Sequence, residues 1–197
     1  MFDHVTIRVA DPGASRRFYE TTLGAAGIDD WDDFRIEPGD SPTHNLHIGF
    51  SVASRDHVHA FWEAGVQAGY TDDGEPGPRP QYTDDYYGGF LLDPDGNSAE
   101  AVHHAGVRRG GIVDHVWMRV ADLAAAKAFY DSIASEAGYR LNKELPGRVA
   151  YVSERPGGGD FSIVEGEPTG NAHLAFPAGR GDALDDPDGN TVELVVR

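Results

Sequence analysis

Cysteine is absent from this chain of 197 residues. Its absence excludes disulfide bonds, thiolate metal ligands and thiol nucleophiles. Long apolar runs are missing as well, since no stretch approaches the roughly 20 residues that a membrane-spanning helix needs. The first strand that the sequence predicts begins almost at Met1, so we expect no signal peptide. A cytoplasmic location is compatible with these features and is the one we expect.

Basic residues are scarce. Lysine and arginine together number 16, against 33 aspartate and glutamate residues, and the formal net charge is −17. A surface this acidic repels nucleic-acid phosphates and anionic membranes, so we expect neither as a partner. The remaining composition, with 40% apolar and 25% charged residues, is that of an ordinary globular protein.

A nine-residue strand pattern occurs twice, as DHVTIRVAD at 3–11 and DHVWMRVAD at 114–122. Two further pairs follow in the same order: PTHNLHIGF with PTGNAHLAF, and DPDGN at 93–97 with DPDGN at 186–190. A preserved order indicates a tandem duplication rather than chance. The segment 104–111, rich in glycine and arginine, is the expected link, and we predict domains at 1–105 and 112–197.

The two copies differ in length inside. Copy 1 is short between Tyr19 and Asp33, where copy 2 carries the leucine- and valine-rich stretch 139–153. Copy 2 is short between Phe176 and Asp186, where copy 1 carries a helix and more strand. This pattern predicts two specialised halves rather than two equal ones.

Three helices are predicted from their start signals. Asp11 followed by Pro12 is typical of a helix N-cap and first position, and Asp122 caps the counterpart in copy 2. Ser54 caps a further helix that copy 2 lacks. The apolar spacing predicts which side chains face inward: in the Asp122 helix Ala125, Phe129 and Ile133, and in the Ser54 helix Val58, Phe61, Trp62 and Gly65.

Each copy carries two strand histidines and one strand glutamate. Strand alternation puts Val5, Ile7 and Val9 on one face and His4 on the other, more polar face. The same alternation applies to the later strands. Two histidines and a carboxylate are a ligand set for a divalent metal with open coordination positions. The candidate ligands are His4, His47 and Glu100 in copy 1, and His115, His173 and Glu193 in copy 2.

These motifs together resemble the vicinal oxygen chelate superfamily, which includes glyoxalase I, fosfomycin-resistance proteins, extradiol dioxygenases and bleomycin-resistance proteins. The resemblance implies an α+β fold, in which tandem βαβββ modules form cupped mixed β-sheets with helices on the outside. It also implies that the six candidate ligands bind a divalent metal, Fe2+, Mn2+, Zn2+ or Ni2+. Some members exchange modules, so a site could also combine His115 with His47 and Glu100, or His4 with His173 and Glu193.

Three functional classes follow from the resemblance. The first is a metal-dependent enzyme that acts on a small substrate with vicinal oxygens: a lyase, an isomerase or a ring-cleaving dioxygenase. Glyoxalase I usually adds a second carboxylate, and the matching positions near Arg35 and Ser162 are not acidic, although Glu37 and Glu165 are close. The second class is a metal-free binding protein of the bleomycin-resistance type. In the third, copy 2 only completes a pseudo-dimer. A monomer and a homodimer both remain open.

Other residues could shape the site. Tyr82, Tyr86 and Tyr87 precede the last strand of copy 1, and one of them could bond a substrate oxygen or act as an acid or base. Alternation places Tyr86 and Tyr87 on opposite faces. Arg8 and Arg119 share strand faces with His4 and His115 and could attract an anionic substrate.

Overall fold

The computed structural model describes residues 1–155, 158–179 and 181–196. Its helices are α1 (Pro12–Ala25), α2 (Arg55–Gln67) and α3 (Leu123–Ala137). Its strands are β1 (His4–Val9), β2 (Phe34–Pro38), β3 (Leu46–Ser51), β4 (Thr71–Pro78), β5 (Tyr87–Leu92), β6 (Ser98–His103), β7 (Val113–Val120), β8 (Tyr139–Leu145), β9 (Arg148–Ser153), β10 (Asp160–Glu165), β11 (Ala172–Ala178), β12 (Asp182–Asp185) and β13 (Thr191–Val196). No helix in the described residues is both long and apolar enough to cross a membrane.

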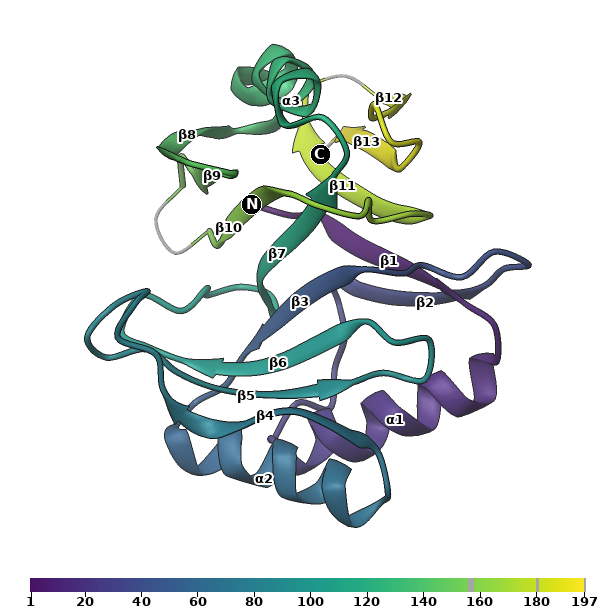
Figure 1. Ribbon diagram of the computed structural model, residues 1–197, viewed down its shortest axis with the longest axis vertical. Coiled ribbons are helices and arrows are strands. Elements are labelled where there is room, and N and C mark those ends of the chain that lie inside the picture. The colour runs from purple at the N-terminus through teal and green to yellow at the C-terminus, as the bar shows by residue number, and fades with distance from the viewer. Residues whose placement is uncertain (156–157, 180, 197) are drawn as a thin grey trace.

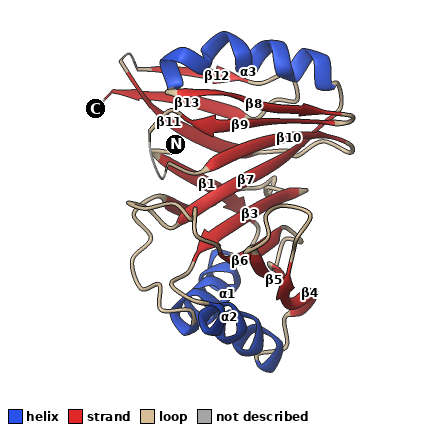
Figure 2. Cartoon of the chain, turned by 90° about the vertical axis from the view of Figure 1, so that its left-hand side faces the viewer, coloured by secondary structure: helices blue, strands red, loops and turns tan. Residues whose placement is uncertain are grey.

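The strands form two mixed sheets, and each sheet draws on both halves of the sequence. One has the order β12-β13-β11-β1-β2, and the other β4-β5-β6-β3-β7-β10-β9-β8. Figures 1 and 2 show α1 and α2 together at one end of the molecule and α3 at the other, with the sheets between them. The predicted α+β class is confirmed. The expected boundary at 104–111 stays a prediction, because strands from both sides of it pair in each sheet.

The two sheets are joined by a reciprocal pair of contacts just before β3 and β11. The hydroxyl of Thr43 donates to the carbonyl of Asn171, and that of Thr169 donates to the carbonyl of Asn45, both at 2.8 Å. Asn45 and Asn171 have φ angles of 56° and 59°. Asparagine tolerates this left-handed conformation better than most residues. Each half therefore contributes the same threonine and asparagine contacts to the junction between the halves.

The Asp-Pro-Asp-Gly-Asn segments do more than turn the chain. Asp93 accepts a hydrogen bond from the hydroxyl of Tyr19 in α1 at 3.0 Å, and Asp186 accepts one from Tyr130 in α3 at 2.9 Å. All four side chains are buried. Each turn thus anchors the helix that begins its own half, since a buried carboxylate needs such a donor.

The caps predicted for all three helices are confirmed, at Asp11, Ser54 and Asp122. The inward face predicted for α3 was right at Ile133, which is buried, and wrong at Ala125, which is exposed, while Phe129 is half-buried. The buried residues are Ala126, Tyr130, Ile133 and Ala137. The reason is Tyr130, whose ring packs on Phe161 and whose hydroxyl must reach Asp186, so it turns the helix to bring that side inward.

The segments that are present in one copy and missing from the other form additional strands in the structure. The stretch 139–153 forms β8 and β9 at one edge of the eight-stranded sheet, and copy 1 has no counterpart between α1 and β2. Conversely, α2, β4 and β5 lie between β3 and β6, whereas among the described residues between β11 and β13 the structure has the short β12 alone. The eight-stranded sheet therefore holds both of the longer modules.

A buried ion pair ties the link between the halves to the beginning of the chain. Arg108 pairs with Asp33 and also donates to the carbonyls of Val113, at 2.8 Å, and Phe2, at 2.9 Å. Asp33 accepts a further bond from the backbone of Ile112 at 2.9 Å. These contacts offset the cost of removing both charges from water.

We expect Arg108→Met to lower the free energy of unfolding by about 3 kcal/mol or more, because it leaves the buried carboxylate of Asp33 without its cation. Urea unfolding followed by circular dichroism measures the change. Arg109→Met, at the exposed neighbouring position, should unfold like the wild type. Equal stability of the two variants would contradict the structural role given to Arg108.

Candidate metal centre

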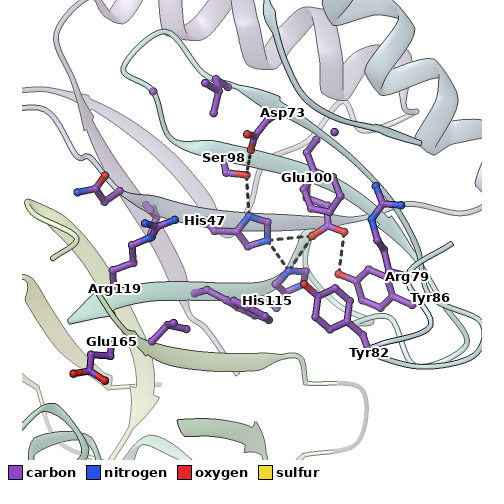
Figure 3. Close-up of a pocket in the computed structure, with 18 residues that line it drawn as sticks. His47, Asp73, Arg79, Tyr82, Tyr86, Ser98, Glu100, His115, Arg119 and Glu165 are labelled. Carbon is purple, nitrogen blue, oxygen red and sulfur yellow. Dashed lines mark hydrogen bonds and ion pairs between the residues drawn. The ribbon is translucent and has the colours of Figure 1, made fainter. Parts of the chain in front are cut away.

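Three side chains from adjacent strands of the eight-stranded sheet converge on one point. His47 lies on β3, Glu100 on β6 and His115 on β7. The Nε2 atom of His47 is 3.1 Å from Oε2 of Glu100 and 3.1 Å from Nε2 of His115, which is 3.2 Å from the same Oε2. Figure 3 shows this triangle. We call these residues the buried triad.

The triangle has the size of a metal-binding face. Ligand atoms about 2.1 Å from a central ion lie about 3.0 Å apart along an octahedral edge and about 3.4 Å apart along a tetrahedral one. The distances of 3.1 to 3.2 Å fall between these values. Two imidazole nitrogens and a carboxylate oxygen suit Fe2+, Mn2+, Zn2+ or Ni2+. The residues present therefore fit a divalent ion.

Two glycines make this close approach possible. A Cβ atom at Gly49 would lie 2.2 Å from Cε1 of His115, and one at Gly88 would lie 2.1 Å from Oε1 of Glu100. No side chain could occupy either position without moving a ligand. Gly49 is the cross-strand partner of His115, so the imidazole lies directly over the bare backbone of β3.

Every ligand is held by an outer partner. Nδ1 of His115 donates to Asp114 at 3.1 Å. The hydroxyl of Ser98 donates to Asp73 at 2.7 Å and therefore accepts from Nδ1 of His47 at 3.0 Å. Such bonds leave each Nε2 with its lone pair directed at the metal position.

The carboxylate of Glu100 is held in the same way. The hydroxyl of Tyr86 donates to its Oε1 at 2.9 Å, while Oε2 belongs to the triangle. Burial alone would raise the pKa of Glu100, but hydrogen bonds from His115 and His47 outweigh it and hold that pKa below its ordinary value. Burial by itself lowers the pKa of His115, but Asp114 and Glu100 outweigh it and raise that pKa. The site is thus built for positive charge next to an ionised carboxylate.

The buried triad opens into a cavity of about 690 Å³. Its walls combine aromatic faces with two arginines: Phe90, Trp117 and Tyr82, with Arg79 and Arg119. Figure 3 shows the two arginines on opposite sides of the triad. A small substrate could therefore reach the metal position from the solvent.

The second set of candidate ligands is looser. In the five-stranded sheet, Nε2 of His173 lies 3.0 Å from Oε2 of Glu193, but Nε2 of His4 is 4.0 Å from that oxygen. Nη1 of Arg35 donates to Nε2 of His4 at 3.1 Å. This Nε2 is the nitrogen that a metal at the open site would need. The side chain of Glu193 is 38% exposed, against 1% for Glu100. We call these residues the open triad.

Two differences accompany the looser geometry. Ala175 is the cross-strand partner of His4, in the place that Gly49 holds opposite His115. His4 therefore lies opposite a methyl group, whereas His115 lies opposite a bare glycine backbone. In addition, β12 is only four residues long and offers no counterpart of Tyr86 to fix Glu193.

Both triads use the exchanged pairing that the sequence left open. His115 joins His47 and Glu100, and His4 joins His173 and Glu193. Strand pairing between β3 and β7, and between β1 and β11, is responsible. Each site is therefore made from both halves of the chain.

A sequence model described as the Glyoxalase/Bleomycin resistance protein/Dioxygenase superfamily matches residues 1–101. The chain belongs to this superfamily. No curated protein matches its sequence. Among solved structures, the superfamily fold is found in glyoxalase I from Zea mays, which is 16% identical with a TM-score of 0.67, where the match covers 99% of this chain and 92% of that one.

A putative dioxygenase from Bacillus subtilis also matches, at 11% identity and a TM-score of 0.64, and the match covers 99% of this chain and 84% of that one. At such identities the likeness establishes the fold and not the reaction. The family model confirms the superfamily that the sequence motifs resemble.

The other candidate residues divide into two groups. Tyr86, Tyr82 and Arg119 line the cavity of the buried triad. Tyr87 points to the opposite face, as alternation predicts, and its hydroxyl lies 2.8 Å from Nε2 of His59 in α2. Arg8 is exposed on β1 beside Gly39, away from that cavity.

Several residues that shape the site were missed in the sequence. Asp114 and its counterpart Asp3, which contacts His4 at 2.9 Å, precede a ligand histidine in both copies, and this repeated Asp-His pair was an available signal. Ser98 and Gly88 carry no such signal, because their roles depend on strands that lie far away in the sequence.

Gly49→Ala should weaken binding of Zn2+ by at least about 100-fold, because the new methyl group displaces the His115 ring; outer contacts alone change such affinities about 10- to 100-fold. Competition with a chromophoric chelator measures the affinity. Ala175→Gly, at the matching position of the open triad, is the control and should leave that affinity unchanged. Tight Zn2+ binding by the Gly49 variant would show that the backbone contact is dispensable.

Proposed function

We propose that the protein is an enzyme that binds one divalent metal ion at His47, Glu100 and His115 and acts on a small molecule with two neighbouring oxygen atoms. The main support is the triangle of three candidate ligand atoms that lie 3.1 to 3.2 Å apart. Each of the three side chains is also hydrogen-bonded to a residue outside the triangle, and the triangle borders the cavity. The metal would supply Lewis acidity that stabilises negative charge on a substrate oxygen. The open triad has no part in this proposal.

The chain's own residues have distinct roles in the proposal. Asp114 and Ser98 orient the two imidazoles, and Tyr86 keeps Oε2 of Glu100 turned toward the metal position. Burial and the nearby charge of Glu100 raise the pKa of Tyr82, so its hydroxyl stays protonated and can donate to a substrate oxygen. Trp117 packs edge-on against both His47 and Tyr82 and limits the space beside them.

The ligand number favours one set of reactions over another. Two histidines and one carboxylate form the facial arrangement of non-haem iron oxygenases. Ser162 lies where a further carboxylate would be expected, and Glu165 lines the far part of the cavity. This supports a ring-cleaving dioxygenase more than the glyoxalase I reaction. Both sheets and all three ligands come from one chain, so a monomer suffices for the site, and we propose that it works in the cytoplasm.

The proposed function is tested by elemental mass spectrometry of protein purified without chelators. We expect about one metal ion per chain, lost in His47→Ala and kept in His173→Ala, because in the open triad Nε2 of His4 lies 4.0 Å from Glu193 and is bonded by Arg35. Iron would direct assays to oxygen-dependent ring cleavage, and nickel or zinc to isomerases and lyases. A wild type without metal, even after reconstitution, would instead support a metal-free binding protein of the bleomycin-resistance type.

A second prediction concerns Tyr86 as a positioning residue. Tyr86→Phe should weaken metal affinity about tenfold, because it leaves Oε1 of the buried Glu100 without a donor. Chelator competition again gives the affinity. The adjacent Tyr87→Phe removes a hydroxyl from the opposite face and should bind metal like the wild type. An equal effect of the two changes would exclude the positioning role.

A further inference from the structure

Next to the buried triad, the strand position that could have supplied a fourth ligand is occupied by a serine that is bonded to an arginine. His47 pairs with Ser98, and Glu100 lies two residues further along β6. By the same register His115 pairs with Asp160 of β10, and Ser162 lies two residues further. The buried hydroxyl of Ser162 accepts hydrogen bonds from Nε of Arg148 at 3.3 Å and Nη2 at 3.1 Å. A guanidinium therefore faces this side of the site in place of a carboxylate.

Arg148 is held in one orientation. Its guanidinium carbon lies 3.7 Å from the centre of the Trp117 ring, a close cation–π contact. Together with the bonds to Ser162, this fixes the plane of the side chain, which is half-buried. Burial lowers the pKa of Arg148, but an arginine remains charged.

Arg148 lines a hollow of about 280 Å³ that shares Tyr82, Tyr86, His115 and Trp117 with the main cavity. Two acids share this hollow. Asp114 already binds His115 and the backbone N–H of Arg108, and burial raises the pKa of Asp160. Within the described part of the chain, no carboxylate lies within ion-pair distance of Arg148.

The other two arginines of the site are less suited to hold a substrate. Both amino groups of Arg79 donate to backbone carbonyls of β4, those of Pro78 and Glu75, and so are already occupied. Arg119 is exposed. Arg148 is half-buried, its guanidinium is held in one orientation, and no carboxylate lies within ion-pair distance of it among the described residues, although Asp160 of the same hollow acts on it electrostatically. An arginine in such surroundings is suited to recognise a carboxylate.

We propose that the hollow beside the buried triad binds a carboxylate of the substrate, and that Arg148 is the residue that determines this specificity. The inference rests on the proposed function, because the vicinal oxygens of the same molecule would face His47, Glu100 and His115. The substrate class is then a small vicinal-oxygen compound that carries a carboxylate, with its apolar part between Trp117 and Phe90.

The test compares two probes that differ only by the carboxylate, 3,4-dihydroxybenzoate and catechol. Dissociation constants are measured by isothermal titration calorimetry on Zn2+-loaded protein. We expect the wild type to bind 3,4-dihydroxybenzoate at least about tenfold more tightly than catechol, as a charged hydrogen-bonded contact implies. In Arg148→Gln this ratio should fall to about one, while Zn2+ content and catechol binding stay unchanged.

Two further variants make the result specific. Arg148→Lys keeps the positive charge but not the planar guanidinium, and should retain part of the preference for 3,4-dihydroxybenzoate over catechol. Arg140→Gln removes an exposed arginine of β8 and should retain all of it. An unchanged ratio in Arg148→Gln, or no binding of either probe by metal-loaded wild type, would overturn the inference. Failure of the proposed function would be seen separately, as a wild type that holds no metal.

Discussion

The antiparallel pairing of β3 with β7 is the constraint on which the site depends. It joins histidines 68 residues apart in the sequence and sets Gly49 opposite His115, so that one imidazole lies on the bare backbone of the facing strand. The parallel pairing of β3 with β6 then adds Glu100 from the other side. Because side chains alternate along a strand, a slip of one residue in either pairing would turn a ligand to the opposite face. Strand register therefore decides which side chains meet at the buried triad.

The buried triad also sets an electrostatic problem that the fold has to solve. Glu100 is 1% exposed, and an isolated carboxylate at that depth would be strongly destabilising. Two imidazoles and the Tyr86 hydroxyl surround it, and Asp114 balances His115 from behind. A divalent ion at the centre would complete this balance of charge. Such a polar network inside a sheet departs from the rule of apolar burial, as functional sites commonly do.

The sequence indicated the candidate ligands but not how they are paired in space. Local signals predicted the capped helices, the strand faces and all six candidate ligands, because these depend on spacing within one segment. The pairing of His115 with His47 stayed open, since register between distant strands is decided by tertiary packing. The roles of Gly49 and Gly88 could not be predicted for the same reason. Each glycine leaves room for a side chain on the neighbouring strand, His115 for Gly49 and Glu100 for Gly88. In α3, local spacing selected Phe129, whereas a long-range bond selected Tyr130.

The difference between the two triads follows from small changes on a shared frame. The reciprocal threonine contacts and the Tyr19–Asp93 and Tyr130–Asp186 bonds occur in both halves, so the frame is the same. What differs is a methyl group at Ala175, a guanidinium at Arg35 and the length of β12. Of these, the guanidinium occupies a ligand nitrogen of the open triad directly. In both sheets an arginine stands on the same side of the histidine: Arg35 directly at His4, and Arg148 through Ser162 beside His115. In the open triad the arginine donates to the candidate ligand nitrogen of His4. In the buried triad Ser162 lies between the arginine and the site, so the metal position stays free.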